Sequence, residues 1–352
     1  MKIAVRSFSG VRSDLSWSDP SDWNQIADFA KEAESLGADS IWTSEAWGTD
    51  AITPLAYLAA STTKIRLGTG IVQVGSRTPG NLVMTSLTLQ SMSGGRFILG
   101  LGTSGPQVIE GFHGVTFGNP VLRTKELLEI IKMGVSGEKL QYQGKYYQLP
   151  LDGGEGKSIR TSAKTWHVPV YVASLGPSNL EMTGEKADGW IGGCFIPETG
   201  NVFLDKIKEG LFRSGRSIED IDILIPVSLD FTDDVEETAK RHARGYGFTF
   251  GAMGSVKNNF YKNAYARQGY GEIVDVVQKL WVEGRREEAR DMVPNELALK
   301  SNLIGTDKMI KERLLLYKNL GVSTLKVDLP GDDIASKSDA LGRLMDLVSD
   351  LD

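Results

Sequence analysis

Glu45 and Trp47 are the residues of this sequence best suited to chemistry at one place. They lie in the stretch Ser44–Gly48, directly after a predicted buried strand at Ser40–Thr43. A carboxyl group there could donate or accept a proton, and an indole could form a wall against which a planar ring stacks. The alternative for Glu45 is structural, as an exposed loop carboxylate or as the partner of a nearby arginine such as Arg77. A lone carboxylate by itself favours that structural alternative.

A second group of residues could bind an anion. Ser174, Leu175 and Gly176 follow a predicted strand at 168–173 and lead into a predicted helix. Backbone N–H groups at the N-terminus of a helix attract anions, and glycine leaves them accessible. Ser178 could instead be an ordinary N-cap, a role that serine fills whatever the function. The residues alone leave anion binding and simple capping equally open.

A glycine pattern, Gly100-x-Gly102-x-x-Gly105, matches the dinucleotide-binding fingerprint literally. That fingerprint requires a helix that opens at the third glycine and an acidic residue about 20 positions further on, at the end of a second strand. Here a proline and further glycines follow, and Glu126 lies inside a helical pattern. We therefore reject a dinucleotide site of that type.

Composition excludes several other chemistries. The 352 residues include three scattered histidines and one cysteine, Cys194, so neither a metal site nor an internal disulfide is expected. Serine hydrolysis lacks a Gly-x-Ser-x-Gly turn, and no spacing ties Asp230 or Asp328 to Glu45 as a second acid. His113 could contact a ligand, although bracing of a loop is the stronger interpretation. The unusual feature is 40 glycines, about 11 per cent against an average of roughly 7 per cent.

Charge and hydropathy indicate the setting. The net charge is −6, without clustered basic residues, which disfavours nucleic-acid binding. No run of about 18 apolar residues predicts a membrane span, and the N-terminus lacks the apolar stretch of a signal peptide. We expect a soluble cytoplasmic protein.

The elements that position these residues alternate between strands and helices. Alternating units imply a parallel sheet, and eight of them favour a closed (β/α)8 barrel over a doubly wound open sheet. Active sites of such barrels lie at the C-terminal ends of the strands, where the candidate residues and many glycines are found. The predicted strands are Lys2–Arg6, Ser40–Thr43, Ile65–Gly68, Phe97–Leu101, Val168–Ala173, Gly189–Gly192, Ile223–Leu229 and Thr324–Asp328.

Two stretches are too long for a minimal barrel. We interpret residues 135–166, with a hairpin at Lys139–Tyr147, and residues 233–305 as insertions at the C-terminal mouth of a single domain that spans 1–352. The second stretch is rich in aromatic residues between Phe248 and Tyr270, which we expect to act as a lid.

Several stretches together make the sequence resemble the luciferase-like monooxygenase superfamily of flavin and deazaflavin barrels. The most specific are Leu67–Ile71 and Ser76–Pro79, supported by Ile41–Glu45, Gly100–Gly114 and the closing Leu320–Asp328. Within that superfamily the chain looks closest to the coenzyme F420-dependent oxidoreductases. The resemblance implies a (β/α)8 barrel of the bacterial luciferase type, with insertions.

The resemblance also implies where a cofactor binds. Gly70-Ile71 matches the position of a cis peptide that forms a bulge against the face of the ring. Thr103, Ser104 and Gly105 match the turn beside the pyrimidine side of the ring. Ser174, Leu175 and Gly176 match the backbone that holds the cofactor phosphate. The resemblance therefore favours anion binding over simple capping at these residues.

Two departures restrict the substrate. Where deazaflavin sugar-phosphate dehydrogenases have an Asp-His pair, this chain has Glu45-Ala46, and Gly105 stands near the position of their glutamate. Ala46 and Gly105 cannot exchange protons, so oxidation of a sugar phosphate is not expected. Glu45 is left as the ionisable candidate, with Trp47 as a wall of the site.

The resemblance thus implies hydride transfer between coenzyme F420 and a small apolar or conjugated substrate. An FMN-dependent monooxygenase, supplied with reduced flavin by a partner reductase, is the nearest alternative. A barrel that binds a flavin-like ligand without turnover and a cofactor-free hydrolase also stay open. Members of the family form dimers, so a homodimer is expected, while the physiological substrate and the direction of transfer are not indicated.

Overall fold

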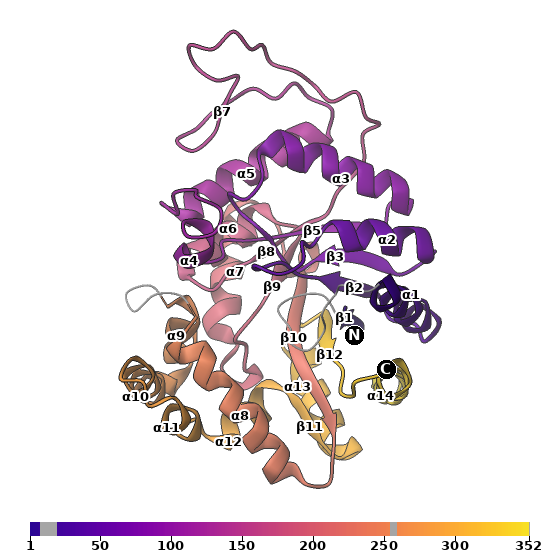
Figure 1. Cartoon of the computed structure of the whole chain (residues 1–352), viewed down its shortest axis with the longest axis vertical. Coiled ribbons are helices and arrows are strands. Elements are labelled where there is room, and N and C mark those ends of the chain that lie inside the picture. The colour runs from indigo at the N-terminus through magenta and orange to yellow at the C-terminus, as the bar shows by residue number, and fades with distance from the viewer. Residues whose placement is uncertain (8–19, 254–258, 352) are drawn as a thin grey trace.

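The computed structural model describes residues 1–7, 20–253 and 259–351, and its centre is a closed barrel of eight parallel strands (Figure 1). The barrel strands run in the order β1, β2, β3, β5, β8, β9, β10 and β12, and β12 pairs with β1 to close the ring. This confirms the predicted (β/α)8 barrel and excludes the open sheet. The strand bounds are β1 Lys2–Arg6, β2 Ser40–Thr43, β3 Arg66–Thr69, β5 Phe97–Gly102, β8 Val170–Ala173, β9 Gly189–Ile191, β10 Asp222–Phe231 and β12 Thr324–Asp328.

Four short strands stand outside that ring. Val72–Gln73 (β4) pairs with β5, and Leu303–Gly305 (β11) pairs with the far end of β10. Tyr142–Gln143 (β6) and Gln148–Leu149 (β7) form the predicted hairpin, shifted toward its second half. Two- and three-residue strands carry too little periodicity to be recognised in a sequence.

Helices surround the barrel (Figure 1). Several of them begin at proline, which suits the first turn because it lacks the N–H that would be unpaired there. The helices are α1 Pro20–Ser35, α2 Thr53–Ser61, α3 Pro79–Ser93, α4 Pro106–Ile109, α5 Pro120–Val135, α6 Pro177–Lys186, α7 Asn201–Arg213, α8 Val235–Gly251, α9 Phe260–Tyr265, α10 Gly271–Val282, α11 Arg286–Asp291, α12 Asn295–Ser301, α13 Asp307–Asn319 and α14 Ile334–Ser349, with short turns η1 Pro197–Thr199, η2 Ile218–Asp220 and η3 Ala266–Tyr270.

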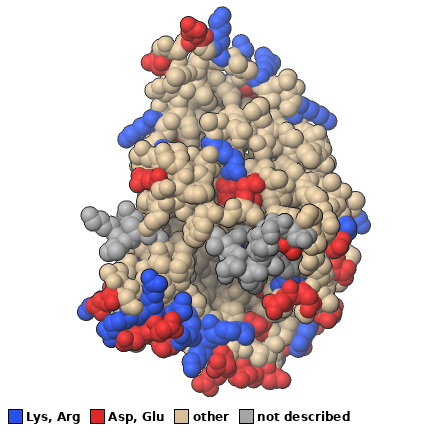
Figure 2. All heavy atoms as spheres, viewed as in Figure 1, with Lys and Arg blue, Asp and Glu red and all other residues tan. Residues whose placement is uncertain are grey.

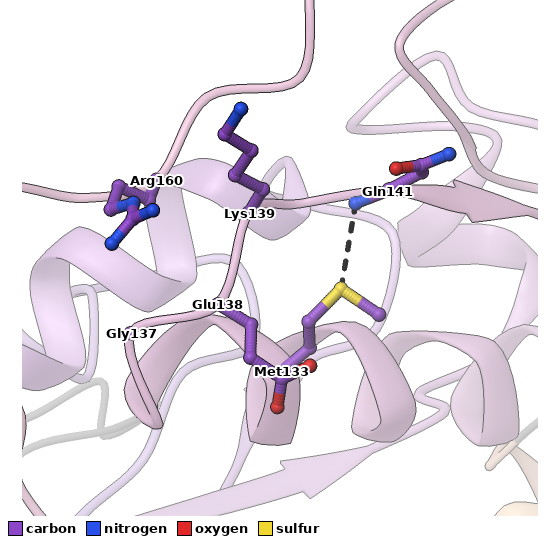
Figure 3. A pocket seen from close by; sticks show the side chains of 6 residues that line it. All are labelled: Met133, Gly137, Glu138, Lys139, Gln141 and Arg160. Atoms are coloured by element: carbon purple, nitrogen blue, oxygen red, sulfur yellow. Dashed lines mark hydrogen bonds between the residues drawn. The ribbon is translucent and has the colours of Figure 1, made fainter.

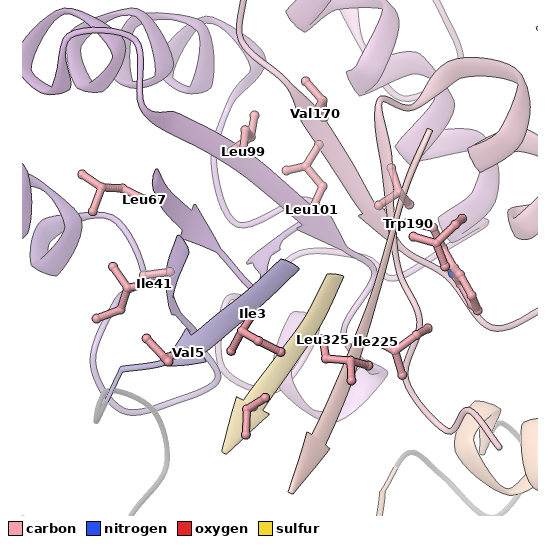
Figure 4. Close-up of a cluster of buried hydrophobic side chains, with 14 of the residues drawn as sticks. Ile3, Val5, Ile41, Leu67, Leu99, Leu101, Val170, Trp190, Ile225 and Leu325 are labelled. Atoms are coloured by element: carbon pink, nitrogen blue, oxygen red, sulfur yellow. The ribbon is translucent and has the colours of Figure 1, made fainter. Parts of the chain in front are cut away.

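Side chains alternate between two apolar layers along each barrel strand. The outward positions pack beneath the helices, as Figure 4 shows for Ile3, Val5, Leu99 and Leu325 among others. The inward positions fill the barrel with a smaller cluster, which consists of Ala4, Trp42, Ile98, Tyr171, Ile191 and Leu224. Because successive residues of a strand point to opposite faces, the strands β1, β2, β5, β8, β9 and β10 contribute to both layers.

Two of the strand glycines serve this internal packing. A Cβ atom on Gly68 would lie 2.5 Å from the ring of Trp42, and one on Gly100 would lie 1.8 Å from the carbonyl oxygen of Thr69. Both distances are far below a van der Waals contact, so no other residue fits there. Part of the glycine excess therefore makes room for the protein's own atoms.

The stretch 135–166 lies against the outer helices α3 and α5, not over the mouth as predicted (Figure 1). Glu126 on α5 accepts hydrogen bonds from the backbone N–H groups of Lys145, Tyr146 and Tyr147. Leu140 contacts Gly134 of the same helix. The carboxylate of Glu126 is thus the acceptor for three N–H groups in the turn of the hairpin. These hydrogen bonds hold the stretch 135–166 on the outside of the barrel.

The stretch 233–305 contains the helices α8 to α12 and a second apolar core. Tyr246, Phe250 and Tyr265 pack against one another with ring centroids 5.1 to 6.0 Å apart. Phe250 and Tyr265 lie in the interior of this helical unit, whereas Phe248 is 45% exposed. The lid role of the stretch stays a prediction. Residues 254–258 of the expected lid lie outside the described residues. The division into one domain with two insertions stays a prediction.

Candidate active site at the barrel mouth

A cavity of about 240 Å³ opens at the C-terminal ends of β1, β2, β3, β10 and β12. Its walls include two cations, one carboxylate and several uncharged polar groups, so the expectation of an apolar substrate does not match this lining. The lining residues are Arg6, Ser44, Gly70, Pro226, Val227, Ser228, Asn302, Lys326 and Asp328.

Gly70 and Ile71 lie at the end of β3, beside this cavity. The peptide bond between them is cis, as the resemblance implies. The backbone N–H of Gly70 donates to the carbonyl oxygen of Thr43 over 2.6 Å, and the side chain of Ile71 lies over Gly102 at the end of β5. These contacts bring the bulge next to the strand end that precedes the turn 103–105.

The three stretches expected to hold a cofactor lie at neighbouring strand ends. In the β5–β8 ladder, Gly102 pairs with Ala173, so Thr103 and Ser174 leave adjacent strands at the same level. Ser104 has a φ of 56°, in the left-handed region, which turns the chain sharply toward α4. The structure thus assembles residues 70–71, 103–105 and 174–176 along one side of the mouth.

Gly176 is the N-cap of α6, and the space beside its Cα is open. The carbonyl oxygen of Leu175 accepts a hydrogen bond from Nη2 of Arg267 over 2.5 Å. The hydroxyl of Ser174 points the other way, to Thr183 at 2.9 Å, so only the backbone of Ser174 is available to a ligand.

Two buried polar atoms near this turn have no hydrogen-bond partner among the described residues. They are Nε of Arg267, a donor, and Oδ1 of Asn179 in the first turn of α6, an acceptor. A buried polar group without a partner costs about 1–3 kcal/mol, unless a ligand supplies one. Burial lowers the pKa of Arg267 from its usual value. An anionic group that also carries hydroxyls fits these donors and this acceptor.

The carboxylate of Glu45 is already occupied. Its oxygens accept hydrogen bonds from both terminal nitrogens of Arg77 at 2.7 and 2.9 Å, and from the backbone N–H groups of Gln73 and Ala51 at 3.1 Å each. Four bonds use the four lone-pair directions of a carboxylate. The side chain is only 8% exposed. This geometry is the structural alternative considered above, and a catalytic role for Glu45 stays a prediction.

Gln73 extends that network across the rim. Its amide nitrogen donates to the carbonyl oxygen of Ala46 over 2.9 Å, and its amide oxygen lies 2.6 Å from Nε2 of His113. His113 therefore braces a loop. Trp47, which follows this anchored loop, is 54% exposed, so its indole is free to contact a ligand.

Three contributing side chains escaped the sequence reasoning. Arg267 lies in the stretch 233–305, more than 90 positions from Leu175, and no local pattern links the two. Arg6 and Lys326 lie on predicted strands, where the alternation of inward and outward side chains could have shown which residues face the interior of the barrel. On Thr324–Asp328, Leu325 and Val327 face outward, so Lys326 had to face the interior of the barrel.

Other polar candidates lie elsewhere. Cys194 contacts Tyr265, and burial raises the pKa of its thiol to about 12, which keeps it a thiol at neutral pH. Asp230 pairs with Nε2 of His242 at 2.5 Å, away from Glu45. Within the described ranges, no cluster of three or more His, Cys, Asp or Glu side chains could hold a metal ion, and no helix has the length and apolar character needed to cross a membrane.

A larger hollow, of about 670 Å³, lies outside the barrel between the end of α5 and the segment near Arg160 (Figure 3). Its charged lining residues Glu138, Lys139 and Arg160 are exposed, and the N–H of Gln141 contacts Sδ of Met133 at 3.4 Å. Figure 2 shows acidic and basic side chains intermixed over the helices α8 to α12, where Arg244 pairs with Glu287 at 2.5 Å. Neither region contains a residue of the predicted site.

Comparisons with known proteins agree with this architecture. The chain is 36% identical over 310 residues to a Mycobacterium tuberculosis protein that is provisionally named a coenzyme F420-dependent oxidoreductase, a match that covers 86% of this chain and 89% of that protein. It is 32% identical over 225 residues to the F420-dependent glucose-6-phosphate dehydrogenase of Kineococcus radiotolerans, covering 60% of this chain and 65% of that enzyme.

Solved structures give the same fold. The coenzyme F420-dependent tetrahydromethanopterin reductase of Methanopyrus kandleri superposes with a TM-score of 0.77 and 21% identity, over 98% of both chains. At that identity the likeness concerns the fold alone. A family model described as luciferase-like monooxygenase matches residues 1–324. With a match over most of its length and a relative of 36% identity, the chain belongs to the luciferase-like monooxygenase family.

Proposed function

We propose that this protein is an oxidoreductase that transfers a hydride between coenzyme F420 and a small organic substrate. The observation that carries the proposal is the set of three backbone stretches, 70–71, 103–105 and 174–176, at neighbouring strand ends. The unpartnered Nε of Arg267 beside the last of them supports an anionic group at that end. Both sequence relatives described above carry F420 in their names, which favours F420 over FMN.

In this proposal the cofactor, when bound, supplies the carbon that carries the hydride. Gly70 and Ile71 would support one face of the ring, and Thr103, Ser104 and Gly105 would lie beside its pyrimidine side. The backbone of Ser174, Leu175 and Gly176, together with the guanidinium of Arg267, would hold the phosphate. Charge-assisted hydrogen bonds of that kind are about twice as strong as neutral ones.

The loop after β2 would complete the site. Trp47 would offer an aromatic wall to the ring or the substrate. Glu45 would hold that loop through Arg77, Gln73 and Ala51, and the variant Glu45→Gln tests whether its carboxylate also contacts the reacting atoms. Ala46 and Gly105 provide no ionisable group, so the substrate is not expected to be a sugar phosphate, in contrast to the Kineococcus relative.

Equilibrium titrations of the purified protein with F420 and with FMN test the cofactor. We expect F420 to bind at least tenfold more tightly than FMN, and reduced F420 to be oxidised when a small ketone or enone is added under nitrogen. Tighter binding of FMN together with oxygen consumption would establish the monooxygenase alternative instead. Binding of F420 without turnover of any alcohol, ketone or enone would favour a carrier of the cofactor. Sedimentation of the same sample tests the expected homodimer.

A further inference from the structure

Lys326 occupies an unusual place in the barrel. It lies on β12 opposite Ala4 of β1, at an inward-facing position of the strand. The position that a Cβ atom would take on Gly70 lies 3.2 Å from Nζ of Lys326. The ammonium group therefore lies directly beside the bulge of β3, at the border between the 240 Å³ cavity and the proposed place of the ring.

This ammonium group has no hydrogen bond or ion pair within the described part of the chain. The nearby carboxylate of Asp328 pairs instead with Nη1 of Arg6, at 3.5 Å. Lys337 provides a contrast, because its buried Nζ donates to the carbonyl oxygens of Leu329 and Gly331 at 3.1 and 2.6 Å. Lys326 is half-buried and lines the cavity. A cation partly withdrawn from water without such partners costs free energy, which indicates that Lys326 is kept for another purpose than stability.

The groups that face Lys326 define its chemistry. Arg6 approaches from β1 and Asp328 from its own strand. The other described residues that line the cavity are uncharged: Ser44, Gly70, Pro226, Val227, Ser228 and Asn302. The amide oxygen of Asn302 accepts a hydrogen bond from the N–H of Ser228, and its amide nitrogen donates to the hydroxyl of Tyr246. Burial, and then the charge of Arg6, lower the pKa of Lys326 to about 8, and Asp328 acts in the opposite direction. The amine and the ammonium ion are thus both accessible near neutral pH.

We propose that Lys326 is the catalytic acid for a carbonyl substrate, whose oxygen enters the cavity beside Arg6. This inference rests on the proposed function. The carbonyl carbon accepts a hydride from reduced F420, the C=O π bond breaks, and its electron pair takes a proton from Nζ of Lys326. The products are an alcohol, oxidised F420 and a neutral amine, which regains its proton from water. In the reverse direction the neutral amine removes the hydroxyl proton while the carbon gives up its hydride.

A positioned proton donor contributes roughly 10²–10⁴-fold to a rate. We therefore expect Lys326→Met to bind F420 within twofold of the wild type and to reduce a ketone or enone at least about 100-fold more slowly in single turnover. Lys326→Arg keeps the charge but does not release a proton near neutral pH, so it should be as slow as Lys326→Met. In the wild type, the rate of reduction should fall as the pH rises through about 8, and this fall should be absent from Lys326→Met.

Competitive acetylation of the unliganded protein, followed by peptide mass spectrometry, measures the amine without any cofactor. The reactivity of Lys326 should reach half its maximum near pH 8, with Lys311 on α13, which pairs with Asp350 at 3.2 Å, as an internal reference. A Lys326 that stays protonated above pH 10 overturns the inference, whatever the activity shows.

The remaining outcomes separate the two proposals. A wild type that binds no F420 or transfers no hydride overturns the proposed function and, with it, this inference. An active wild type overturns the inference alone if Lys326→Met is within threefold of it, or if Lys326→Arg restores the rate, because the lysine would then act only through its charge.

Discussion

Two parts of the barrel mouth use ionisable groups in opposite ways. On the β2–β3 side, Glu45 accepts four hydrogen bonds and holds Arg77 in a bidentate ion pair. On the β12–β1 side, Lys326 has no partner among the described residues, and Arg6 has only a 3.5 Å contact with Asp328. Ser44, next to Glu45, and Lys326 line the same cavity. The polar groups of the first side are satisfied within the chain, whereas Lys326 on the second side is without a partner among the residues that the structure describes.

The difference shows how a rim can be rigid and reactive together. Fully satisfied polar networks fix a single geometry, and here they anchor the loop that carries Trp47. Unsatisfied donors, by contrast, reduce the stability of the empty protein and are stabilised when a ligand supplies acceptors. Arg267 near α6 belongs with Lys326 in this respect, because its Nε is buried and unpartnered among the described residues.

Substitution of Arg77 is the strongest test of the satisfied side. Arg77→Met leaves a carboxylate that is 8% exposed without its cation, and loss of one partner of a buried pair costs about 3 kcal/mol. We expect the free energy of unfolding in urea to fall by about that amount. Arg244→Met is the matched control, since its partner Glu287 is 67% exposed and surface pairs contribute about 0–1 kcal/mol. An unchanged midpoint for Arg77→Met would contradict the comparison.

Glu45→Gln separates structure from catalysis on the same side. If the carboxylate serves only to hold the loop, the folded variant should keep hydride transfer within about threefold while its stability falls. Single-turnover oxidation of reduced F420, measured well below the unfolding temperature, checks this. A loss of 100-fold or more would restore Glu45 as the proton carrier and remove the need for Lys326.

Arg267→Met tests whether the unpartnered donors serve the cofactor. A hydrogen bond to a charged group contributes about 1.5–3 kcal/mol, so the affinity for F420 should fall roughly 30-fold with little change in stability. Equilibrium titration measures it, with Arg244→Met again as the control that should bind normally. Equal affinity in the variant and the wild type would mean that the cofactor phosphate lies elsewhere.

Trp47→Ala should have a smaller effect. The indole is 54% exposed, and an aromatic contact contributes about 0.5–1.5 kcal/mol beyond its buried area. We expect the affinity for F420 or the KM of the substrate to weaken about fivefold. Phe212→Ala, at a side chain that is 85% exposed on α7, should change neither. Identical binding by Trp47→Ala and the wild type would remove the indole from the site.

Glu34, a carboxylate away from the mouth whose hydrogen bonds are all made within the protein, gives the smallest expected effect. Burial acts to raise the pKa of Glu34, but hydrogen bonds from the backbone of Ile65, Lys64 and Thr63 and from the hydroxyl of Thr63 outweigh it and lower the pKa from 4.5 to about 2. A lowered pKa stabilises the fold above pH 4.5 and loses that effect as the pH falls toward 2. Glu34→Gln should therefore reduce the acid dependence of unfolding in this window, as followed by circular dichroism. An unchanged curve would contradict the network around Glu34.

Much of the fold was accessible from the sequence, because the eight barrel strands are regular. Lys2–Arg6, Ser40–Thr43 and Thr324–Asp328 match their predicted bounds, and β3 begins one residue later than predicted. The barrel glycines were harder to interpret, since the contact between Gly68 and Trp42 crosses between two strands. A strand pattern shows which way Trp42 faces but not what it meets inside a closed barrel.

The candidate site was only partly accessible for the same reason. The stretches 70–71, 103–105 and 174–176 could be found because each follows its own strand. Whether the carboxylate of Glu45 is free or paired depends on Arg77, 32 positions away, and the sequence could offer that pairing only as one of two alternatives. Arg267 reaches Leu175 from a separate helical segment, so only the folded chain reveals it.

The closure of the barrel by β12 against β1 has a consequence for biosynthesis. Arg6 and Asp328 lie 322 positions apart, and the cavity between them needs both the first and the last strand. A ribosome that has not yet produced residue 328 therefore carries a chain with two unpaired strand edges and no assembled mouth. Contacts of such long separation form late and slow the folding of a chain. The nascent polypeptide consequently gains a site for chemistry only after residue 328 has been made and can pair with the first strand.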